Sequence, residues 1–208
     1  CESFANYEGF YKNQVIDKLK ELALLDPKAT VRATALATLV TLGEYPAQMA
    51  VIKQALQDSS YAVAATALYA YINAGTGGEN PEPLLQKYEH INNLNIMAAL
   101  ADVYSYFGIY GKQAWFEEKI RKNGGYAQQF LMNYLGTYLL KLSPAERKRG
   151  LEFLFEMAAW ADHHQTRIAA LQALFRLSEM EGVNERLQNI IQAEKHPKVL
   201  EFLKTKTK

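Results

Sequence analysis

The four histidines are the first side chains to consider for metal binding or proton transfer. His163 and His164 are neighbours at the expected start of a helix, where adjacent side chains point roughly 100° apart and cannot ligate one metal together. His90 and His196 are isolated beside expected turns. We therefore interpret all four as surface or capping residues.

Other catalytic patterns are missing from the sequence. No histidine is followed by glutamate, and no Gly-x-x-x-x-Gly-Lys loop, Gly-x-Ser-x-Gly elbow or Gly-x-Gly-x-x-Gly run occurs. The single cysteine, Cys1, cannot form an internal disulfide or a thiolate metal cluster, and we interpret it as a fragment boundary or a lipidation site. We expect no catalytic residue, metal ligand or cofactor in this chain itself.

Two arginines, Arg32 and Arg167, occupy the same place in related segments and could clamp an anionic substrate. A structural role is the stronger hypothesis, because an arginine near the start of a second helix can bond to the aspartate of the preceding turn. The partners would be Asp26 and Asp162. We expect these four residues to form a structural turn ladder.

The segments that position these residues repeat along the chain. Residues 26–39 and 58–71 align at an offset of 58 − 26 = 32 residues. Gly43, Gly75 and Gly108 each follow an apolar stretch, where glycine can end a helix. A period of this size indicates helix hairpins that bury their apolar faces by stacking on one another.

The sequence therefore predicts an all-α solenoid of about five to six antiparallel helix pairs, forming a single domain over residues 1–208. The expected pairs are 13–25 with 28–42, 46–57 with 60–74, 81–91 with 93–107, 112–122 with 126–142, 144–161 with 163–180, and 183–194 with 197–205. The expected core comprises Val31, Ala35, Leu36, Leu39, Val63, Ala67, Leu68, Tyr71, Leu100, Val103, Ala170, Leu171 and Leu174. Most of the other tyrosines in the middle repeats are also expected to be core rings.

The two ends of the chain differ in character. Residues 1–12 place Phe4, Tyr7, Phe10 and Tyr11 on one helical face, which predicts either a docking segment or a fold back onto the first hairpin. The lysine-rich residues 203–208 are expected to fray. The longest apolar run is too short to cross a bilayer, so we expect no membrane span.

The face of each second helix opposite the core is a candidate binding surface. Its predicted positions are Thr34, Thr38, Thr41, Thr66, Ala70, Asn73, Ala98, Asp102 and Ser105. These side chains are small and mostly neutral, and the chain carries 23 Lys and Arg against 22 Asp and Glu. A phosphate groove needs a basic excess, so we expect an extended peptide or a protein partner and no nucleic acid.

The segment Asp26-Pro27-Lys28-Ala29-Thr30-Val31-Arg32 resembles a HEAT repeat. Over about residues 12–75, and more thinly to 180, the chain looks like the C-terminal helical domain of bacterial aminopeptidase N-type zinc metallopeptidases. This resemblance implies a HEAT-like α-solenoid that acts as a non-catalytic C-terminal accessory domain, shaping or closing the peptide-substrate chamber. Zinc would then be bound only by an N-terminal catalytic domain of the same polypeptide, in the periplasm or cytoplasm of a bacterium.

Two alternatives compete with this hypothesis. A free-standing HEAT-repeat scaffold would use the same face to bind a protein partner. A HEAT-type DNA glycosylase would need a basic face with aromatic residues and an acid, and the neutral Thr, Ala and Asn positions argue against it. A His-Glu-x-x-His motif encoded upstream of Cys1 would decide between the first two.

Overall fold

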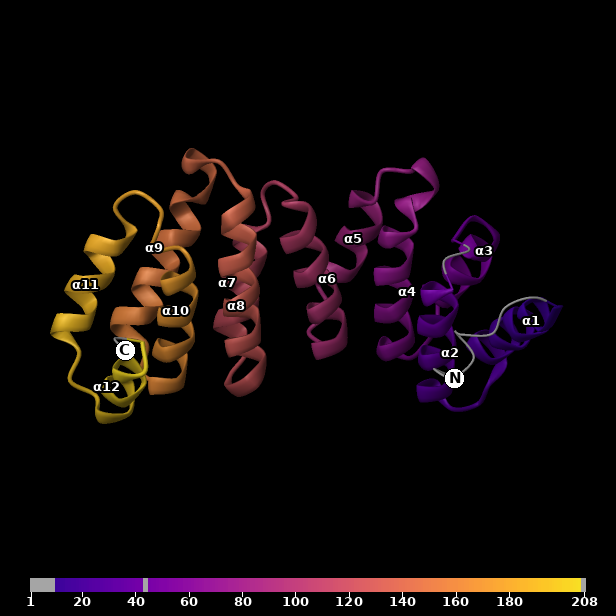
Figure 1. The fold of residues 1–208 in the computed structure, drawn as a ribbon, viewed down its shortest axis with the longest axis horizontal. Helices are drawn as coiled ribbons and strands as arrows, with labels where there is room; N and C mark the ends of the chain where they lie inside the picture. Colours follow the sequence, from indigo (N-terminus) through magenta and orange to yellow (C-terminus); the bar gives the residue numbers. More distant parts are fainter. Residues whose placement is uncertain (1–9, 43–44, 207–208) are drawn as a thin grey trace. The chain divides into compact units, whose positions relative to one another are not determined.

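The chain folds into helices joined by short turns (Figure 1). The computed structural model describes residues 10–42 and 45–206, and within these it contains twelve α-helices, one short 3-10 helix and no strand. The helices are α1 (Phe10–Leu25), α2 (Ala29–Thr41), α3 (Tyr45–Ala55), α4 (Tyr61–Asn73), η2 (Gly75–Gly78), α5 (Glu82–Glu89), α6 (Leu94–Phe107), α7 (Gln113–Lys122), α8 (Gly125–Lys141), α9 (Pro144–Trp160), α10 (His164–Arg176), α11 (Val183–Ala193) and α12 (Pro197–Lys204). The all-α prediction is confirmed, and each expected helix is present with ends shifted by a few residues.

Local sequence explains several of the helix ends. Ser143 and Glu146 form a capping box at the start of α9, in which the Ser143 amide donates to Glu146 Oε2 at 2.9 Å. Gly75 and Gly108 follow α4 and α6 with φ angles of 75° and 62°, in the left-handed region that glycine adopts without strain. The glycine spacing in the sequence therefore marked real helix ends; Gly43 lies outside the described residues.

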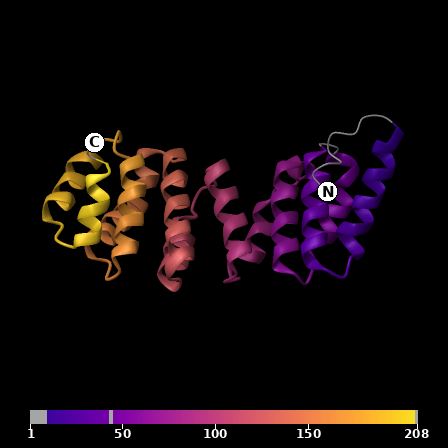
Figure 2. The same ribbon diagram turned by 60° about the horizontal axis from the view of Figure 1, so that its bottom comes forward.

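Contacts gather in two compact units, Cys1–Leu100 and Ala101–Lys208, which divide within α6. In the first unit α2 packs on α1 and α4, and α4 also packs on α3. In the second, α8 packs on α7 and α10, and α10 also packs on α9 and α12. Within each unit the helices thus contact mostly their sequence neighbours and lie side by side (Figure 1, Figure 2). A single repeat domain over residues 1–208 stays a prediction.

The core lies between the helices of each unit. Twelve of the thirteen expected core residues are buried, among them Leu36 and Leu68 in the first unit and Leu171 in the second. Val31 is only partly buried, because it lies in the first turn of α2, near the end of the helix. The helical periodicity therefore identified the buried face correctly.

Two glycines allow close helix packing in the second unit. A Cβ added to Gly136 in α8 would lie 3.0 Å from the Cβ of Ala173 in α10. A Cβ added to Gly150 in α9 would lie 2.6 Å from Leu139 Cδ2. The Gly150 amide also donates to the buried Gln113 side chain at 2.8 Å, which joins α7 to α9.

The expected end segments are only partly within the described residues. Phe4 and Tyr7 lie outside them, as do the side chains of Phe10 and Tyr11, so the docking hypothesis for residues 1–12 stays a prediction. At the other end, α12 continues through Lys204 and buries Leu203, so the segment from residue 203 begins inside a packed helix rather than as a frayed tail.

Candidate functional site

On the second helices, some of the residues that face solvent are neighbours of the predicted ones. On α2, Thr34 and Thr41 are exposed as expected, but Thr38 is 6% exposed and the neighbouring Ala37 faces solvent. On α4, Asn73 is exposed and Thr66 partly so.

Two further positions on this face are corrected in the same way. Ala70 is fully buried, and Tyr69 is exposed in its place. On α6, Asp102 is partly exposed, whereas Ser105 is buried and donates to the main-chain oxygen of Tyr134 at 3.0 Å. Tyr106 is 69% exposed. The physical reason is that α2 packs on α4 as well as on α1, so the exposed stripe narrows to about one residue per turn.

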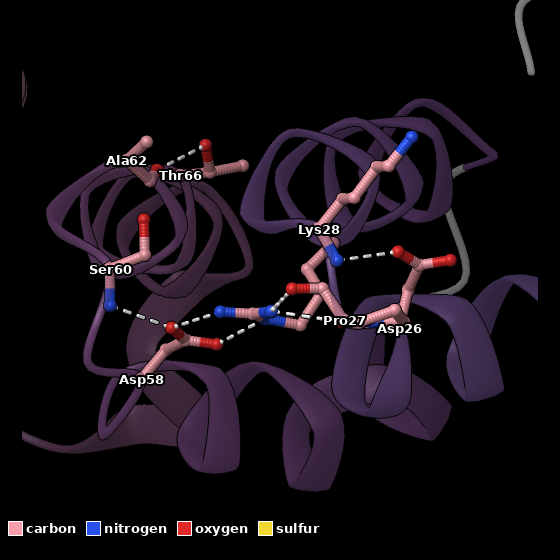
Figure 3. Close-up of polar contacts among 8 residues, drawn as sticks. Asp26, Pro27, Lys28, Asp58, Ser60, Ala62 and Thr66 are labelled. Atoms are coloured by element: carbon pink, nitrogen blue, oxygen red, sulfur yellow. Dashed lines mark hydrogen bonds and ion pairs between the residues drawn. The ribbon is translucent and has the colours of Figure 1, made fainter.

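The polar side chains of this face are bonded within their own helices. The hydroxyls of Thr34, Thr38, Thr41 and Thr66 donate to main-chain carbonyls three or four residues earlier at 2.7–3.0 Å, as Figure 3 shows for Thr66. The Asn73 amide donates to the Tyr69 carbonyl at 2.9 Å. Because these donors are used locally, the face is less polar than its composition indicates.

Charged side chains are distributed unevenly between the first and the second helices of the pairs. Within the described second helices α2, α4, α6, α8 and α10, Asp102 is the one carboxylate. The first helices of the second unit instead carry a ladder of exposed ion pairs, in which Arg149 pairs with Glu117, Arg121 with Glu156 and Arg186 with Glu152. These ion pairs join α7 to α9 and α9 to α11. Charged side chains therefore concentrate on the first helices, and these five second helices carry few of them.

Both arginines of the predicted turn ladder bond to turns, but to other carboxylates than the predicted Asp26 and Asp162. Arg32 donates to both carboxylate oxygens of Asp58 at 2.7 and 2.8 Å, and to the main-chain oxygen of Asp26 at 2.8 Å (Figure 3). The Asp26 carboxylate instead accepts from the Lys28 amide at 2.8 Å. The arginine of one helix pair thus bonds to the carboxylate in the turn of the next pair, rather than to that of its own.

The second arginine follows the same rule. Arg167 forms an ion pair with Glu194, whose side chain is 3% exposed and which lies in the turn between α11 and α12. The expected partner, Asp162, is exposed. Glu194 also accepts from the amides of Lys195 and His196 at 2.8 and 2.6 Å, as Asp58 accepts from the Ser60 amide at 2.7 Å. The two arginines occupy equivalent places, so an arginine–carboxylate contact joins consecutive pairs in both units, although Nε of Arg167 has no hydrogen-bond partner.

These contacts keep both carboxylates ionised. The hydrogen bond from Arg32 lowers the pKa of Asp58 and outweighs the opposing effect of burial. Burial alone would raise the pKa of Glu194, but the bonds from Arg167 and from two amides together lower it. A carboxylate with a lowered pKa is a poor proton donor or acceptor at neutral pH. The contacts of Arg32 and Arg167 are therefore suited to holding turns together and not to acid–base chemistry.

Two histidines meet between α10 and α12. The rings of His164 and His196 stack with centroids 5.0 Å apart and an interplanar angle of 9°. His196 caps α12, because its Nδ1 accepts from the Lys198 amide at 3.3 Å, which confirms the capping interpretation for this residue. Among the residues that the structure describes, no group of three or more His, Cys, Asp or Glu side chains could hold a metal ion.

Several aromatic rings were wrongly expected in the core. Tyr71, Tyr104 and Tyr138 are buried, but several other rings face solvent. The exposed tyrosines are Tyr61, Tyr69, Tyr106, Tyr110 and Tyr126. On α8, Tyr126, Phe130 and Tyr134 follow one another along the helix with ring centroids 6.0 and 4.7 Å apart. Their spacing of four residues was a readable signal of a single face.

Comparison with known proteins identifies no family or relative: no protein-family model, no curated protein and no solved structure matches this chain. Over the described residues, no helix is both long and apolar enough to cross a membrane. The observations that bear on function are therefore the second-helix face, the two arginine–carboxylate contacts and the aromatic rings of α8.

Proposed function

We propose that this chain is a non-catalytic helical-repeat domain that binds peptide or protein segments on the exposed face of its second helices. In this proposal the helix pairs form a HEAT-like α-solenoid. The domain serves as the accessory part of a zinc aminopeptidase, where it shapes or closes the peptide-substrate chamber. Zinc would be bound by a catalytic domain of the same polypeptide, and not by this chain.

The concentration of charged side chains on the first helices of the pairs is the observation that supports this proposal most strongly. Protein-binding surfaces are depleted of charged residues at their centre and enriched in tyrosine and arginine. Helices α2, α4, α6, α8 and α10 have this composition, with exposed Tyr69, Tyr106 and Tyr126 and a single carboxylate, Asp102. The first helices carry the ion pairs typical of a solvated surface.

Photo-crosslinking tests the binding face directly. A benzophenone amino acid replaces Tyr69 or Tyr126 on second helices, or Glu118 on α7 as the matched control. Each variant is irradiated with a tryptic digest of casein and analysed by mass spectrometry. We expect peptide adducts at the two tyrosine positions and few at residue 118. Equal labelling at all three positions would contradict a specific binding face.

A second measurement tests the aminopeptidase context. The pure chain should not hydrolyse an aminoacyl-arylamide, with or without added zinc, because the proposal places the metal elsewhere. The coding sequence upstream of Cys1 should contain a His-Glu-x-x-His motif. If that motif is missing while the crosslinks form, the free-standing scaffold becomes the better hypothesis. Turnover that chelation abolishes and zinc restores would overturn the non-catalytic assignment.

A further inference from the structure

Helices α10 and α12 pack on each other, and a histidine lies at the start of each. His164 is the first residue of α10, and His196 is the N-cap residue of α12. Both side chains are partly exposed. Because their rings stack in nearly parallel planes, with centroids 5.0 Å apart, the pair joins the first turns of the two helices.

The contacts of this pair require neutral imidazole rings. Nδ1 of His196 accepts a hydrogen bond from the Lys198 amide at 3.3 Å, which caps α12. A protonated ring carries a hydrogen on both nitrogens and cannot accept this bond. Protonation would also place a positive charge at a helix N-terminus, where the helix dipole favours negative charge. The same argument holds for His164, which lies in the first turn of α10.

Most of the charged groups around the stack are positive. Burial lowers the pKa of His164, and positive charges nearby lower it further. The groups responsible are Lys198 on α12, His196 at its start, and His163 and Arg167 at the start of α10. A proton on His164 would therefore meet repulsion from both helices.

The carboxylates of the adjoining turns do little to offset these charges. Glu194, in the turn between α11 and α12, is bonded to Arg167 and accepts from the amides of Lys195 and His196. The pKa of Glu194 is lowered, so it stays ionised in mildly acidic solution, but its oxygens are already used. Asp162, in the turn before α10, is exposed, and water screens its charge.

The stack is a large part of what holds α12 in place. This helix is eight residues long, buries Val199 and Leu203, and packs mainly on α10. Its Phe202 also makes an edge contact with Phe175 of α10, with ring centroids 6.3 Å apart. A short terminal helix with two buried side chains is the kind of segment that opens locally before a whole unit unfolds.

We propose that α12 is an acid-sensitive latch, held on α10 by the neutral His164–His196 stack and released when these rings are protonated. Histidines in the open state have a pKa of about 6.5, and the closed state takes up protons less readily. The latch is therefore closed at neutral pH and opens as the pH falls below about 6.5. Opening uncovers Val199, Leu203 and the part of α10 on which they pack. This inference is independent of the proposed function, because it requires neither a peptide nor a catalytic domain.

Hydrogen exchange followed by mass spectrometry tests the latch in the full chain. Amide protection is measured at pH 7.5 and pH 5.0, after correction for the known effect of pH on chemical exchange. We expect protection in residues 199–204 to fall about tenfold at pH 5.0, since one pKa unit between the closed and open states corresponds to that factor. Protection in α9 should change much less.

Variants assign the effect to the histidine pair. His196→Asn keeps a side-chain acceptor at the N-cap but does not titrate, and His164→Gln removes the other titrating ring. The double variant should keep the same protection in α12 at both pH values. His90→Gln is the control, because it removes a histidine of the first unit, and it should show the wild-type loss. If the double variant already lacks protection at pH 7.5, H196N alone provides the test and should show a smaller loss than the wild type.

Each outcome decides the inference. Unchanged protection of α12 in the wild type would overturn it, and so would an equal fall in α9, which would indicate general acid unfolding of the unit. A loss of wild-type size in both H196N and the double variant would assign the pH dependence to other groups and also overturn it. Missing protection of α12 in the wild type at pH 7.5 would contradict a closed state.

Discussion

At the scale of single residues, the arginine–carboxylate contact is the most specific feature of this fold. Arg32 reaches Asp58 in the turn of the following helix pair through two nitrogens, and Arg167 reaches Glu194 in the equivalent turn through its Nη2 atom. A bidentate pair fixes both distance and orientation, which single-point contacts do not. The contact therefore joins consecutive pairs at a defined angle.

Asp58→Asn should lower the melting temperature more than Asp26→Asn does. Both variants keep the oxygen that accepts from a turn amide, but only the first removes the carboxylate that Arg32 contacts. Because the pKa of Asp58 is lowered in the folded state, its stabilising effect is present above the unfolded value of about 3.9 and is lost as the pH falls below it. Thermal melts at pH 7 and pH 3 check this: the two variants should differ at pH 7 and converge at pH 3. Equal melting temperatures at pH 7 would contradict the role of Asp58.

His164 should make the free energy of unfolding depend on pH. Burial lowers its pKa, and the positive charges of Lys198, His196, His163 and Arg167 lower it further. The unfolded chain therefore binds a proton more readily, so stability is lost as the pH falls from about 6.5 towards the lower folded pKa. Urea unfolding at pH 7.5 and pH 5 should show a smaller loss for H164Q than for the wild type. H90Q is the control, and it should show the wild-type loss.

At the scale of helices and turns, the sequence predicted well which segments form helices. It predicted less well which residues of each helix face solvent. Apolar periodicity and the glycine spacing located the helices, because both report on a helix and its own partner. Whether Thr38 or Ala37 faces solvent depends on how α2 packs on α4, and a single helix does not encode that contact. For the same reason the carboxylate partner of Arg32 was assigned to the wrong turn.

Gly150→Ala should destabilise the second unit. The added methyl would lie 2.6 Å from Leu139 Cδ2 and 3.3 Å from the Gln113 side-chain oxygen, and overpacking of this kind costs about 1–3 kcal/mol. Gly124→Ala is the control, because a Cβ there meets nothing within 4 Å. Chemical denaturation should show a lower midpoint for G150A only. An unchanged midpoint would mean that Leu139 moves aside without loss.

Leu36→Ala should cost about 2–5 kcal/mol of unfolding free energy, from lost burial and the cavity it leaves. Leu36 is fully buried, whereas Leu25, the control, is 73% exposed. We expect L25A to change the unfolding free energy by less than about 0.5 kcal/mol. Urea titrations followed by circular dichroism measure both values. A loss below about 1 kcal/mol for L36A would place this residue outside the core.

At the scale of the whole molecule, the chain is two compact units, each with its own buried core. A repeat in the sequence reports on local stacking, and it carries little information on where contacts between successive pairs become sparse. The solvent exposure of Tyr126 on α8 and the position of Arg176 beside Asn133 were out of reach, because both depend on tertiary packing.

Hydrogen exchange followed by mass spectrometry should show that the two units respond separately. L36A should reduce amide protection in residues 10–42 and 45–100 and leave residues 101–206 near the wild-type values. Leu171→Ala should do the reverse, because Leu171 is fully buried in the second unit. A matching loss of protection in both units for either variant would show that they unfold as one cooperative body.

The contact between Arg32 and Asp58 also determines where this chain can be recombined. Helix pairs look like natural modules for swapping or duplicating repeats, yet a junction between α2 and α3 falls between these two residues and leaves an unmatched charge on each side. A module that consists of α2, α3 and the turn containing Asp58 carries both partners together. Chimeras cut in the turns within pairs should therefore fold more readily than chimeras cut between pairs.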